Sequence, residues 1–221
     1  MVYYLSWKSG EMPCLPSDWE KYLPAYRIEK ARAYKQEKDR AASVLAFLLL
    51  RYALYKEYAR TAMPQIEIDE NGKPFDVCRM FRFNLSHCDT AVACAVDAAS
   101  IGVDVQHFTP VRENVVKKVC SLSEQLRLAQ SGFDETLFAA FWSAKEAYGK
   151  YTGEGIGYAL QAFDFCPDSH FPQESCLDGV RICTSLHDSF ALSVCSSQKQ
   201  DFLPVSYDQL RTFCAVLTNA L

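Results

Sequence analysis

The side chains best suited to metal or phosphate chemistry lie in two short segments. In IGVDVQ, residues 101–106, alternation along a strand would put Gly102, Asp104 and Gln106 on one face. Gly102 leaves space next to the Asp104 carboxylate, so that another group could approach it closely. An amphipathic strand with a hydrated polar face gives the same alternation, and the pattern by itself favours that interpretation.

The second segment is FWSAKEAYGK, residues 141–150. On a helix, one stripe changes along its length from apolar to charged side chains: Phe138, Trp142, Glu146 and Lys150. A carboxylate that continues a buried stripe needs a cation, a metal ion or several hydrogen bonds to offset its desolvation. Alternatively, Glu146 and Lys150 form an exposed i, i+4 pair that contributes only about a few tenths of a kcal/mol. The spacing does not separate these two interpretations.

Two further features suit an anionic ligand. Ser86 and His87 end a predicted strand and Lys73 lies in the turn before it, so His87 could contact a phosphate or simply cap the hairpin. The segment 27–40 contains six basic and three acidic residues, a local charge of +3, which fits either a ligand with several phosphates or a solvated helix face. The sequence lacks a G-x-S-x-G elbow, and adjacent Ser and His rarely have the geometry of a hydrolase.

The pattern of apolar residues predicts a mixed α+β scaffold for these side chains. Strong helix formers predict long helices at 38–58 and 134–151, the second capped by Asp134 and stopped by Gly153. Shorter helices are expected at 18–35, 111–130 and 207–221. Alternating segments predict strands at 2–7, 65–69, 81–86, 90–97, 101–106, 159–166, 180–186 and 189–196.

The second half of the chain repeats the first. FRFNLSHCDTAVACAV from Phe81 and VRICTSLHDSFALSVC from Val180 align without gaps at an offset of 99 residues. Each hairpin follows a long helix at a similar distance, which favours an internal duplication. We therefore predict an N-terminal α+β half at 1–100 and a C-terminal α+β half at 101–221. A cleft between two such halves is a favoured place for a ligand.

Composition excludes several classes of protein. The chain has 221 residues, 49% of them hydrophobic, which is enough for a packed core and argues against a disordered or fibrous protein. A net charge of −4 gives no general attraction to nucleic acid or to anionic membranes. Neither a signal peptide nor an apolar segment of membrane-spanning length is visible, so we expect a cytoplasmic protein. The ten cysteines are then expected to be reduced and mostly buried.

Four motifs in this order resemble the larger, two-halved phosphopantetheinyl transferases of the surfactin-synthetase-activating type. They are GKP at 72–74, FNLSH at 83–87, IGVDVQ at 101–106 and WSAKEAYGK at 142–150, the last typical of the W/KEA subgroup. The resemblance implies a monomer of two pseudo-symmetric α+β halves with the active site in the cleft between them. It also implies an enzyme that uses Mg²⁺ to move phosphopantetheine from coenzyme A to a serine of an acyl or peptidyl carrier protein, releasing adenosine 3′,5′-bisphosphate.

The resemblance also implies roles for individual residues. Asp104, Gln106 and Glu146 would be the metal ligands, although Gln106 stands where many family members have an acid, which predicts weaker metal binding. Glu146 and Lys150 would be catalytic. The phosphates and adenosine of coenzyme A would be surrounded by Arg27, Lys30, Ser43, Lys73, Ser86 and His87.

Two other functions compete with this one. The exchange of an acid for Gln106 would suit a non-catalytic protein that still binds the coenzyme or the carrier, but Lys145, Glu146 and Lys150 are all retained. A metal-dependent phosphohydrolase would need more acids or histidines around the metal than this sequence offers.

Overall fold

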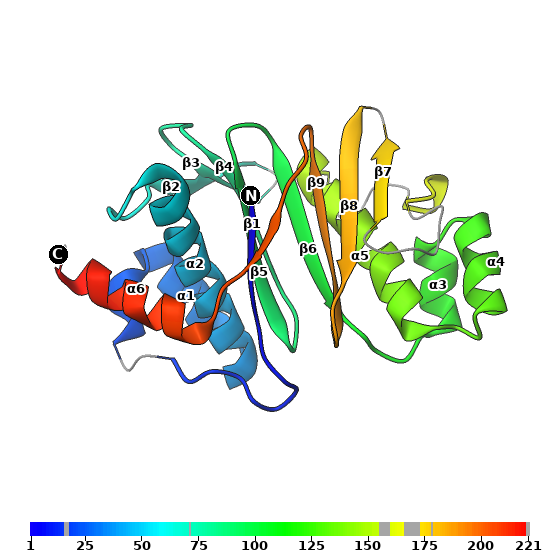
Figure 1. Cartoon of the computed structure of the whole chain (residues 1–221), viewed down its shortest axis with the longest axis horizontal. Coiled ribbons are helices and arrows are strands. Elements are labelled where there is room, and N and C mark those ends of the chain that lie inside the picture. The colour runs from blue at the N-terminus through cyan, green and yellow to red at the C-terminus, as the bar shows by residue number, and fades with distance from the viewer. Residues whose placement is uncertain (16–17, 71, 155–159, 166–172, 178, 220–221) are drawn as a thin grey trace. The chain divides into compact units, whose positions relative to one another are not determined.

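The computed structural model describes residues 1–15, 18–70, 72–154, 160–165, 173–177 and 179–219 (Figure 1). The chain forms two compact units, one comprising Met1–Ala98 with Asp201–Leu221 and the other Ala99–Gln200. We refer to them as unit 1 and unit 2. Both contain helices and strands, which confirms the predicted α+β class.

Unit 1 is built on a four-stranded sheet in the order β10-β1-β5-β4. Its strands are β1 (Val2–Ser6), β4 (Arg82–His87), β5 (Ala91–Asp97) and β10 (Phe202–Pro204), with a separate hairpin of β2 (Ile66–Ile68) and β3 (Pro74–Asp76). Its helices are the 3-10 turn η1 (Trp19–Tyr22), α1 (Ala25–Ala33), α2 (Glu37–Tyr58) and α6 (Tyr207–Asn219), and α1, α2 and α6 lie together on one side of the sheet (Figure 1).

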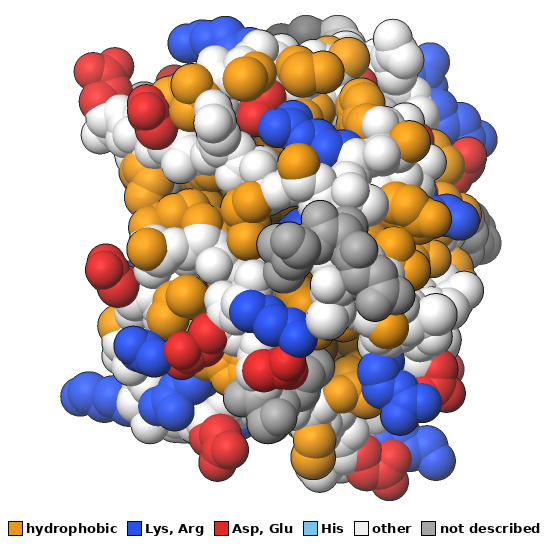
Figure 2. Space-filling view, turned by 90° about the vertical axis from the view of Figure 1, so that its left-hand side faces the viewer, with side chains coloured by type: hydrophobic (Ala, Val, Ile, Leu, Met, Phe, Trp, Pro, Cys, Tyr) orange, Lys and Arg blue, Asp and Glu red, His pale blue; other side chains and the backbone are white. Residues whose placement is uncertain are grey.

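Helix α2 forms the centre of unit 1. This helix is apolar on nearly all sides, and its residues are buried from Ala41 to Leu54, against β4, β5 and the flanking helices. Its burial explains the absence of a polar face, because the sheet and its neighbouring helices cover it on several sides. Figure 2 looks onto the helical side of unit 1, where basic and acidic side chains alternate with apolar ones over the visible surface.

Unit 2 is built on a second four-stranded sheet, in the order β6-β9-β8-β7. Its strands are β6 (Ile101–His107), β7 (Gln173–Leu177), β8 (Val180–Leu186) and β9 (Phe190–Ser196); its helices are α3 (Glu113–Val119), α4 (Leu122–Gln130), α5 (Glu135–Thr152) and the 3-10 turn η3 (Leu160–Ala162). Helix α5 packs across β6, β8 and β9. Asp134 caps it by accepting the N–H of Leu137 at 2.7 Å, and Gly153 ends it with φ of 85°, as predicted.

The strand registers support the predicted duplication. In unit 1 the β4–β5 hairpin pairs Arg82 with Asp97, and in unit 2 the β8–β9 hairpin pairs Arg181 with Ser196. Both pairs are related by the offset of 99 residues found in the sequence. In each unit one long helix, α2 or α5, packs on the hairpin.

The C-terminal segment differs from its prediction. We expected 101–221 to form one half, but Asp201–Leu221 belongs to unit 1. Strand β10 pairs in parallel with β1, the Val2 amide donates to the Asp201 carbonyl at 2.9 Å, and Phe213 of α6 packs against Tyr52 with ring centroids 5.6 Å apart. These contacts join the two ends of the chain, and the repeat does not reveal them because it covers neither end.

Three local predictions also need correction. The segment predicted as one helix at 111–130 is broken at Cys120 and Ser121, because Ser121 caps the start of α4. The described part of the predicted strand 159–166 contains the 3-10 turn η3, and its two end residues lie outside the described residues, as does Asn71 of the predicted turn. The described cysteines are all free, but only four are buried: Cys94, Cys120, Cys195 and Cys214.

Within the described residues, every helix is too short or too polar to cross a membrane.

Candidate active site

Strand β6 and helix α5 bring the two chemical segments of the sequence together in unit 2. The Lys150 ammonium lies 2.7 Å from Oδ1 of Asp104 and also donates to the Val103 carbonyl at 3.2 Å. The Asp104 side chain is 8% exposed and that of Lys150 27% exposed. The alternative that Lys150 forms an exposed pair with Glu146 is therefore wrong, because Lys150 forms its ion pair with the buried Asp104.

Gly102 has a different role from the predicted one. A Cβ atom at this position would lie 2.1 Å from the carbonyl oxygen of Ala147 and 2.5 Å from the backbone nitrogen of Tyr151. The group that approaches β6 closely is therefore the backbone of α5 and not a ligand. Only glycine permits this contact, which sets the distance between the strand that carries Asp104 and the helix that carries Glu146.

Glu146 lies close enough to Asp104 for the two charges to interact. Burial raises the pKa of Glu146, the negative charge of Asp104 raises it further, and the positive charge of Lys150 partly opposes both effects. Its Oε1 atom is buried and has no hydrogen-bond partner among the described residues. Two carboxylates and one ammonium thus leave a net negative charge in a desolvated site, an arrangement that a bound cation would stabilise.

Gln106, the third predicted metal ligand, follows Asp104 on the same face of β6. Its amide nitrogen donates to the carbonyl of His107 at 3.3 Å, which makes its oxygen the atom able to bind a metal. Among the described residues, no group of three or more His, Cys, Asp and Glu side chains is arranged to hold a metal ion. The predicted donor set is two carboxylates, of Asp104 and Glu146, and one amide, of Gln106. Oxygen donors of this kind fit Mg²⁺, which usually keeps several water ligands.

A pocket of about 520 Å³ opens beside Gln106. Phe138 and Trp142, from the stripe predicted on α5, line it and have ring centroids 6.0 Å apart. The remaining lining residues lie in or near α3: Thr109, Pro110, Arg112 and Val115. The pocket places an apolar and basic surface next to the predicted metal ligands.

The predicted coenzyme-binding residues all lie in unit 1, and three of them are buried: Arg27, Ser43 and Ser86. Arg27, 7% exposed, donates to the Ser43 carbonyl at 2.9 Å and lies 5.9 Å from the ring centre of Phe47. Burial lowers the pKa of Arg27. The Ser43 side chain is fully buried, and its hydroxyl lacks a hydrogen-bond partner among the described residues. Arg27 and Ser43 therefore connect α1 to α2, and a ligand could reach them only if α1 moved away from α2.

The other four residues are placed differently. Lys30 lies on α1 with much of its side chain exposed. Partial desolvation of its ammonium, and then the like charge of Arg27, lower the pKa of Lys30. Lys73 follows the turn at Gly72, where φ is 81°, and its amide donates to Asp69 at 2.8 Å. Ser86 is 6% exposed near the end of β4.

His87 ends β4, and its ring meets the edge of Tyr34 with centroids 6.0 Å apart. The Tyr34 contact places His87 next to the junction between α1 and α2. Nearby, Lys38 at the start of α2 pairs with Asp89 at 2.9 Å. Lys38 belongs to the basic segment 27–40 that the sequence singled out, whereas Tyr34 was not identified from the sequence.

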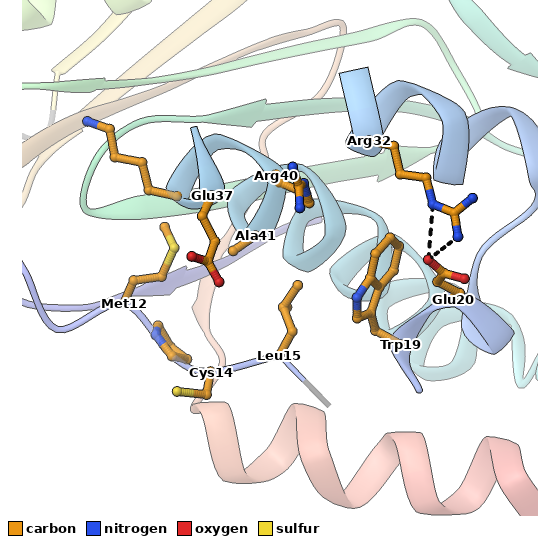
Figure 3. Close-up of a pocket in the computed structure, with 11 residues that line it drawn as sticks. Met12, Cys14, Leu15, Trp19, Glu20, Arg32, Glu37, Arg40 and Ala41 are labelled. Atoms are coloured by element: carbon orange, nitrogen blue, oxygen red, sulfur yellow. Dashed lines mark hydrogen bonds and ion pairs between the residues drawn. The ribbon is translucent and has the colours of Figure 1, made fainter. Parts of the chain in front are cut away.

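The basic segment 27–40 does not form a single anion site. Arg32, Lys38 and Arg40 line a separate pocket of about 620 Å³, shown in Figure 3, together with the acidic residues Glu20 and Glu37. Arg32 pairs with Glu20 at 2.6 Å. The charges in this pocket are therefore largely compensated, and the solvated-face interpretation of this part of the segment is the better one.

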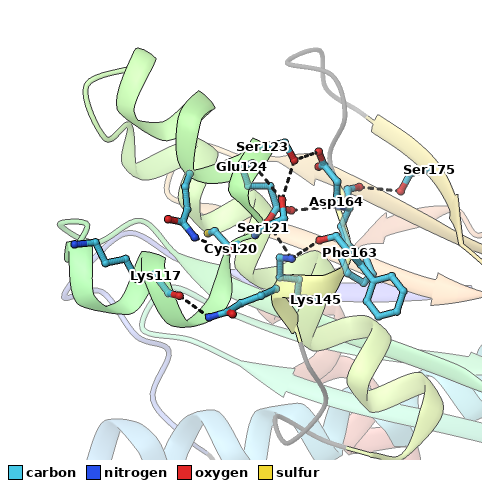
Figure 4. Close-up of polar contacts among 12 residues, drawn as sticks. Lys117, Cys120, Ser121, Ser123, Glu124, Lys145, Phe163, Asp164 and Ser175 are labelled. Carbon is cyan, nitrogen blue, oxygen red and sulfur yellow. Dashed lines mark hydrogen bonds and ion pairs between the residues drawn. The ribbon is translucent and has the colours of Figure 1, made fainter.

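Sequence reasoning missed one polar network in unit 2. Lys145 and Glu124 are both fully buried and lie 2.9 Å apart (Figure 4). The signal was present, since Ser121-x-x-Glu124 is the spacing of a helix capping box, and the structure contains that box. Its partner Lys145 could not be identified locally, because α4 and α5 meet only in the tertiary structure.

Comparisons with known proteins identify a family and several relatives to which this chain is similar. Residues 100–200 match the sequence model of the 4'-phosphopantetheinyl transferase superfamily. The chain is 34% identical over 154 residues to the 4'-phosphopantetheinyl transferase psf-1 of Bacillus pumilus, a match that covers 65% of each chain. It is 26% identical over 207 residues to the 4'-phosphopantetheinyl transferase Sfp of Bacillus subtilis, covering 86% of this chain and 90% of that protein.

The match thus spans just under two thirds of the Bacillus pumilus protein and most of the Bacillus subtilis one. The matched family region contains Asp104, Gln106, Glu146 and Lys150, all in unit 2. Sequence motifs, fold and matched relatives agree: residues 100–200 match the 4'-phosphopantetheinyl transferase superfamily, and the chain is similar over most of its length to a transferase of the Sfp type.

Proposed function

We propose that this protein transfers the 4'-phosphopantetheine group of coenzyme A to a serine of an acyl or peptidyl carrier protein, with Mg²⁺, and releases adenosine 3′,5′-bisphosphate. The single observation that carries the proposal is the group formed by Asp104, Glu146 and Lys150, which lies within the matched family region. We also propose that the protein is a monomer, as the family resemblance implies, and that it is cytoplasmic, as the sequence predicts.

Asp104 and Glu146 would hold Mg²⁺ through carboxylate oxygens and Gln106 through its amide oxygen or a water molecule. The fit rests on the buried Oε1 of Glu146 and on the uncompensated negative charge of the site. When bound, Mg²⁺ supplies positive charge to the pyrophosphate of coenzyme A. The neutral Gln106 removes one negative charge from the ligand set, so metal binding is expected to be weaker than with an acid at this position.

Glu146 is the proposed proton acceptor. As the carrier serine hydroxyl attacks the β-phosphorus, its proton passes to the Glu146 carboxylate, directly or through water. A new bond forms between the serine oxygen and that phosphorus, and the bond from the phosphorus to the bridging oxygen breaks.

Lys150 would neutralise the charge that develops on the departing bisphosphate. Its ammonium already lies 2.7 Å from Asp104, so it is held in position before a substrate binds. A cation in a poorly solvated site stabilises developing charge more strongly than it would in water.

In unit 1, Lys30, Lys73, Ser86 and His87 are the proposed contacts for the phosphates and adenosine. We assign Arg27 and Ser43 the supporting role of holding α1 against α2, because the buried Arg27 guanidinium donates to the Ser43 carbonyl across the contact between these helices.

The carrier protein is proposed to bind the segment 111–130 of unit 2. Leu122 and Leu126 on α4 are 80% and 65% exposed, and Lys117 and Lys118 of α3 supply positive charge. An apolar and basic surface suits an amphipathic, acidic helix of a carrier.

The test is the intact mass of an apo carrier protein incubated with this protein and coenzyme A, with and without Mg²⁺. The proposal predicts a Mg²⁺-dependent gain of one phosphopantetheine group on the carrier serine. Glu146→Gln is expected to abolish the transfer while part of the coenzyme binding survives. Near-normal transfer by this variant would refute the role of Glu146, and coenzyme binding without transfer to any carrier type would favour the non-catalytic alternative.

A further inference from the structure

Adjacent residues of α5 contact different parts of unit 2. Glu146 interacts with Asp104 of β6, whereas the ammonium of Lys145 lies 2.9 Å from Glu124 and donates to the Phe163 carbonyl at 2.7 Å. Lys145 also lies 4.9 Å from the ring centre of Phe165. Since Lys145 is fully buried among these groups, it cannot reach a substrate in this conformation.

Glu124 connects three segments of the chain at one carboxylate (Figure 4). Its Oε2 accepts the Ser121 amide at 2.8 Å as well as the Lys145 ammonium, and its Oε1 accepts the Phe165 amide at 3.2 Å. The Phe165 carbonyl in turn accepts the hydroxyl of Ser175, on β7, at 2.8 Å. The start of α4, the segment 163–165 and α5 are thus fixed to one another.

A buried ion pair is a poor explanation for stability alone, because desolvation of the two charges offsets most of their attraction and an apolar pair often serves as well. This pair is distinctive because each charged group also forms directional hydrogen bonds with backbone groups. The carboxylate accepts backbone N–H groups of two segments, and the ammonium donates to a backbone carbonyl of one of them. Such contacts specify one position of α5 relative to its neighbours.

We propose that Lys145 and Glu124 are positioning residues for the active site. They fix the rotation and axial position of α5, so that Glu146 and Lys150 remain against Asp104. This inference rests on the proposed transferase function. Because a misplacement of about 1 Å can lower a rate by about 100-fold, loss of the pair is expected to affect turnover more than the amount of folded protein.

The first test compares Lys145→Met with the wild type, using Lys199→Met as the matched control. Lys199 also forms an ion pair with a glutamate, Glu174, but the pair is exposed, with the two charged groups 3.4 Å apart. At a temperature where near-ultraviolet circular dichroism shows each protein folded, Lys145→Met is expected to lower kcat by about 100-fold. It should also raise the Mg²⁺ concentration for half-maximal rate by about fivefold or more, while the control changes neither by more than about twofold.

Binding of coenzyme A without Mg²⁺ provides an internal reference, because Lys30, Lys73, Ser86 and His87 lie in unit 1. Its Kd is expected to stay within about threefold of wild type in Lys145→Met. Should Lys145→Met fail to fold, Glu124→Gln keeps the shape of the carboxylate and removes its charge, and the same changes are expected of it.

A charge exchange separates positioning from simple attraction. Glu124→Lys combined with Lys145→Glu retains the ion pair but directs an ammonium at the N–H groups of Ser121 and Phe165. We expect this double variant to remain as impaired in kcat as Lys145→Met. Recovery to within about threefold of wild type would overturn the directional role.

Other outcomes are equally decisive. A kcat for folded Lys145→Met within about threefold of wild type, with unchanged Mg²⁺ dependence, would show that the pair is only structural. If the wild type itself fails to transfer, the proposed function is wrong, and hydrogen exchange decides the inference. Faster exchange of the amides of 146–151 in Lys145→Met than in Lys199→Met would support positioning, and equal exchange would refute it.

Discussion

Replacing Gly102 by alanine tests how closely β6 and α5 must approach. The added Cβ would lie 2.1 Å from the Ala147 carbonyl oxygen, 2.5 Å from the Tyr151 nitrogen and 3.0 Å from the Tyr151 Cα. All three atoms belong to the backbone of α5, so no side-chain rotation relieves the overlap. To reach ordinary contact at 3.4 Å from 2.1 Å, the strand and helix must separate by about 1.3 Å at this point.

The separation has two consequences of different size. Overpacking of this kind lowers the free energy of unfolding by about 1–3 kcal/mol. It also moves Asp104 on β6 away from Lys150 and Glu146 on α5, and a shift of about 1 Å in such a site lowers a rate by about 100-fold. Gly102→Ala is therefore expected to remain folded at about 25 °C, and to lose nearly all transfer activity.

Val103→Ala provides the matched control, because Val103 is fully buried next to Gly102 on the opposite face of β6. It should also lower the free energy of unfolding, measured by urea titration, but it creates a small cavity and leaves the contact between β6 and α5 intact. Transfer rates follow from the intact mass of the carrier. A Gly102→Ala protein with a rate within about twofold of Val103→Ala would refute the reasoning.

Three further predictions concern the charged group itself. Lys150→Ala is expected to lower the transfer rate by about 100-fold and to reduce stability much less; a large loss of stability with a normal rate, read from urea titration and carrier mass, would restore a purely structural ion pair. Gln106→Glu is expected to lower the Mg²⁺ concentration for half-maximal rate, since it adds a negative ligand, and an unchanged Mg²⁺ titration would contradict this. In the metal-free protein, the pKa of Glu146 lies above its usual range because of burial and then of Asp104, so Asp104→Asn should lower that pKa and let Glu146 ionise at lower pH. A raised carboxyl pKa favours folding at low pH, and this contribution is lost as the pH rises through the raised pKa, so Asp104→Asn should lose part of that low-pH stability. NMR titration of the Glu146 carboxyl group gives the pKa, and an upward shift in the variant would contradict the prediction.

Several elements could be predicted because local patterns specify them. Asp134 and Gly153 delimit α5 through capping and a left-handed backbone, and the all-apolar circumference of α2 indicates a buried helix. The two hairpins could be predicted from alternation, and their common offset of 99 residues was visible without any structure. The motifs around Asp104 and Glu146 predicted the two segments that the fold brings together.

Other features depend on which groups meet in space. The sequence placed Lys145 and Lys150 near one stripe of α5, and only the fold showed that Lys145 contacts Glu124 whereas Lys150 contacts Asp104. The reason is that helical spacing defines faces but not the elements that cover them. The burial of Arg27 has the same origin, since it depends on the packing of α1 against α2.

By itself, then, the sequence determined the α+β class, the repeated hairpins and the family to which the catalytic motifs belong, because these depend on periodicity, caps and short spacings. Only the tertiary structure shows that Asp201–Leu221 belongs to unit 1, that the backbone of α5 packs directly against Gly102, and that Lys145 and Glu124 form a buried ion pair. Each of these depends on contacts between residues distant in the chain, which local propensity does not encode.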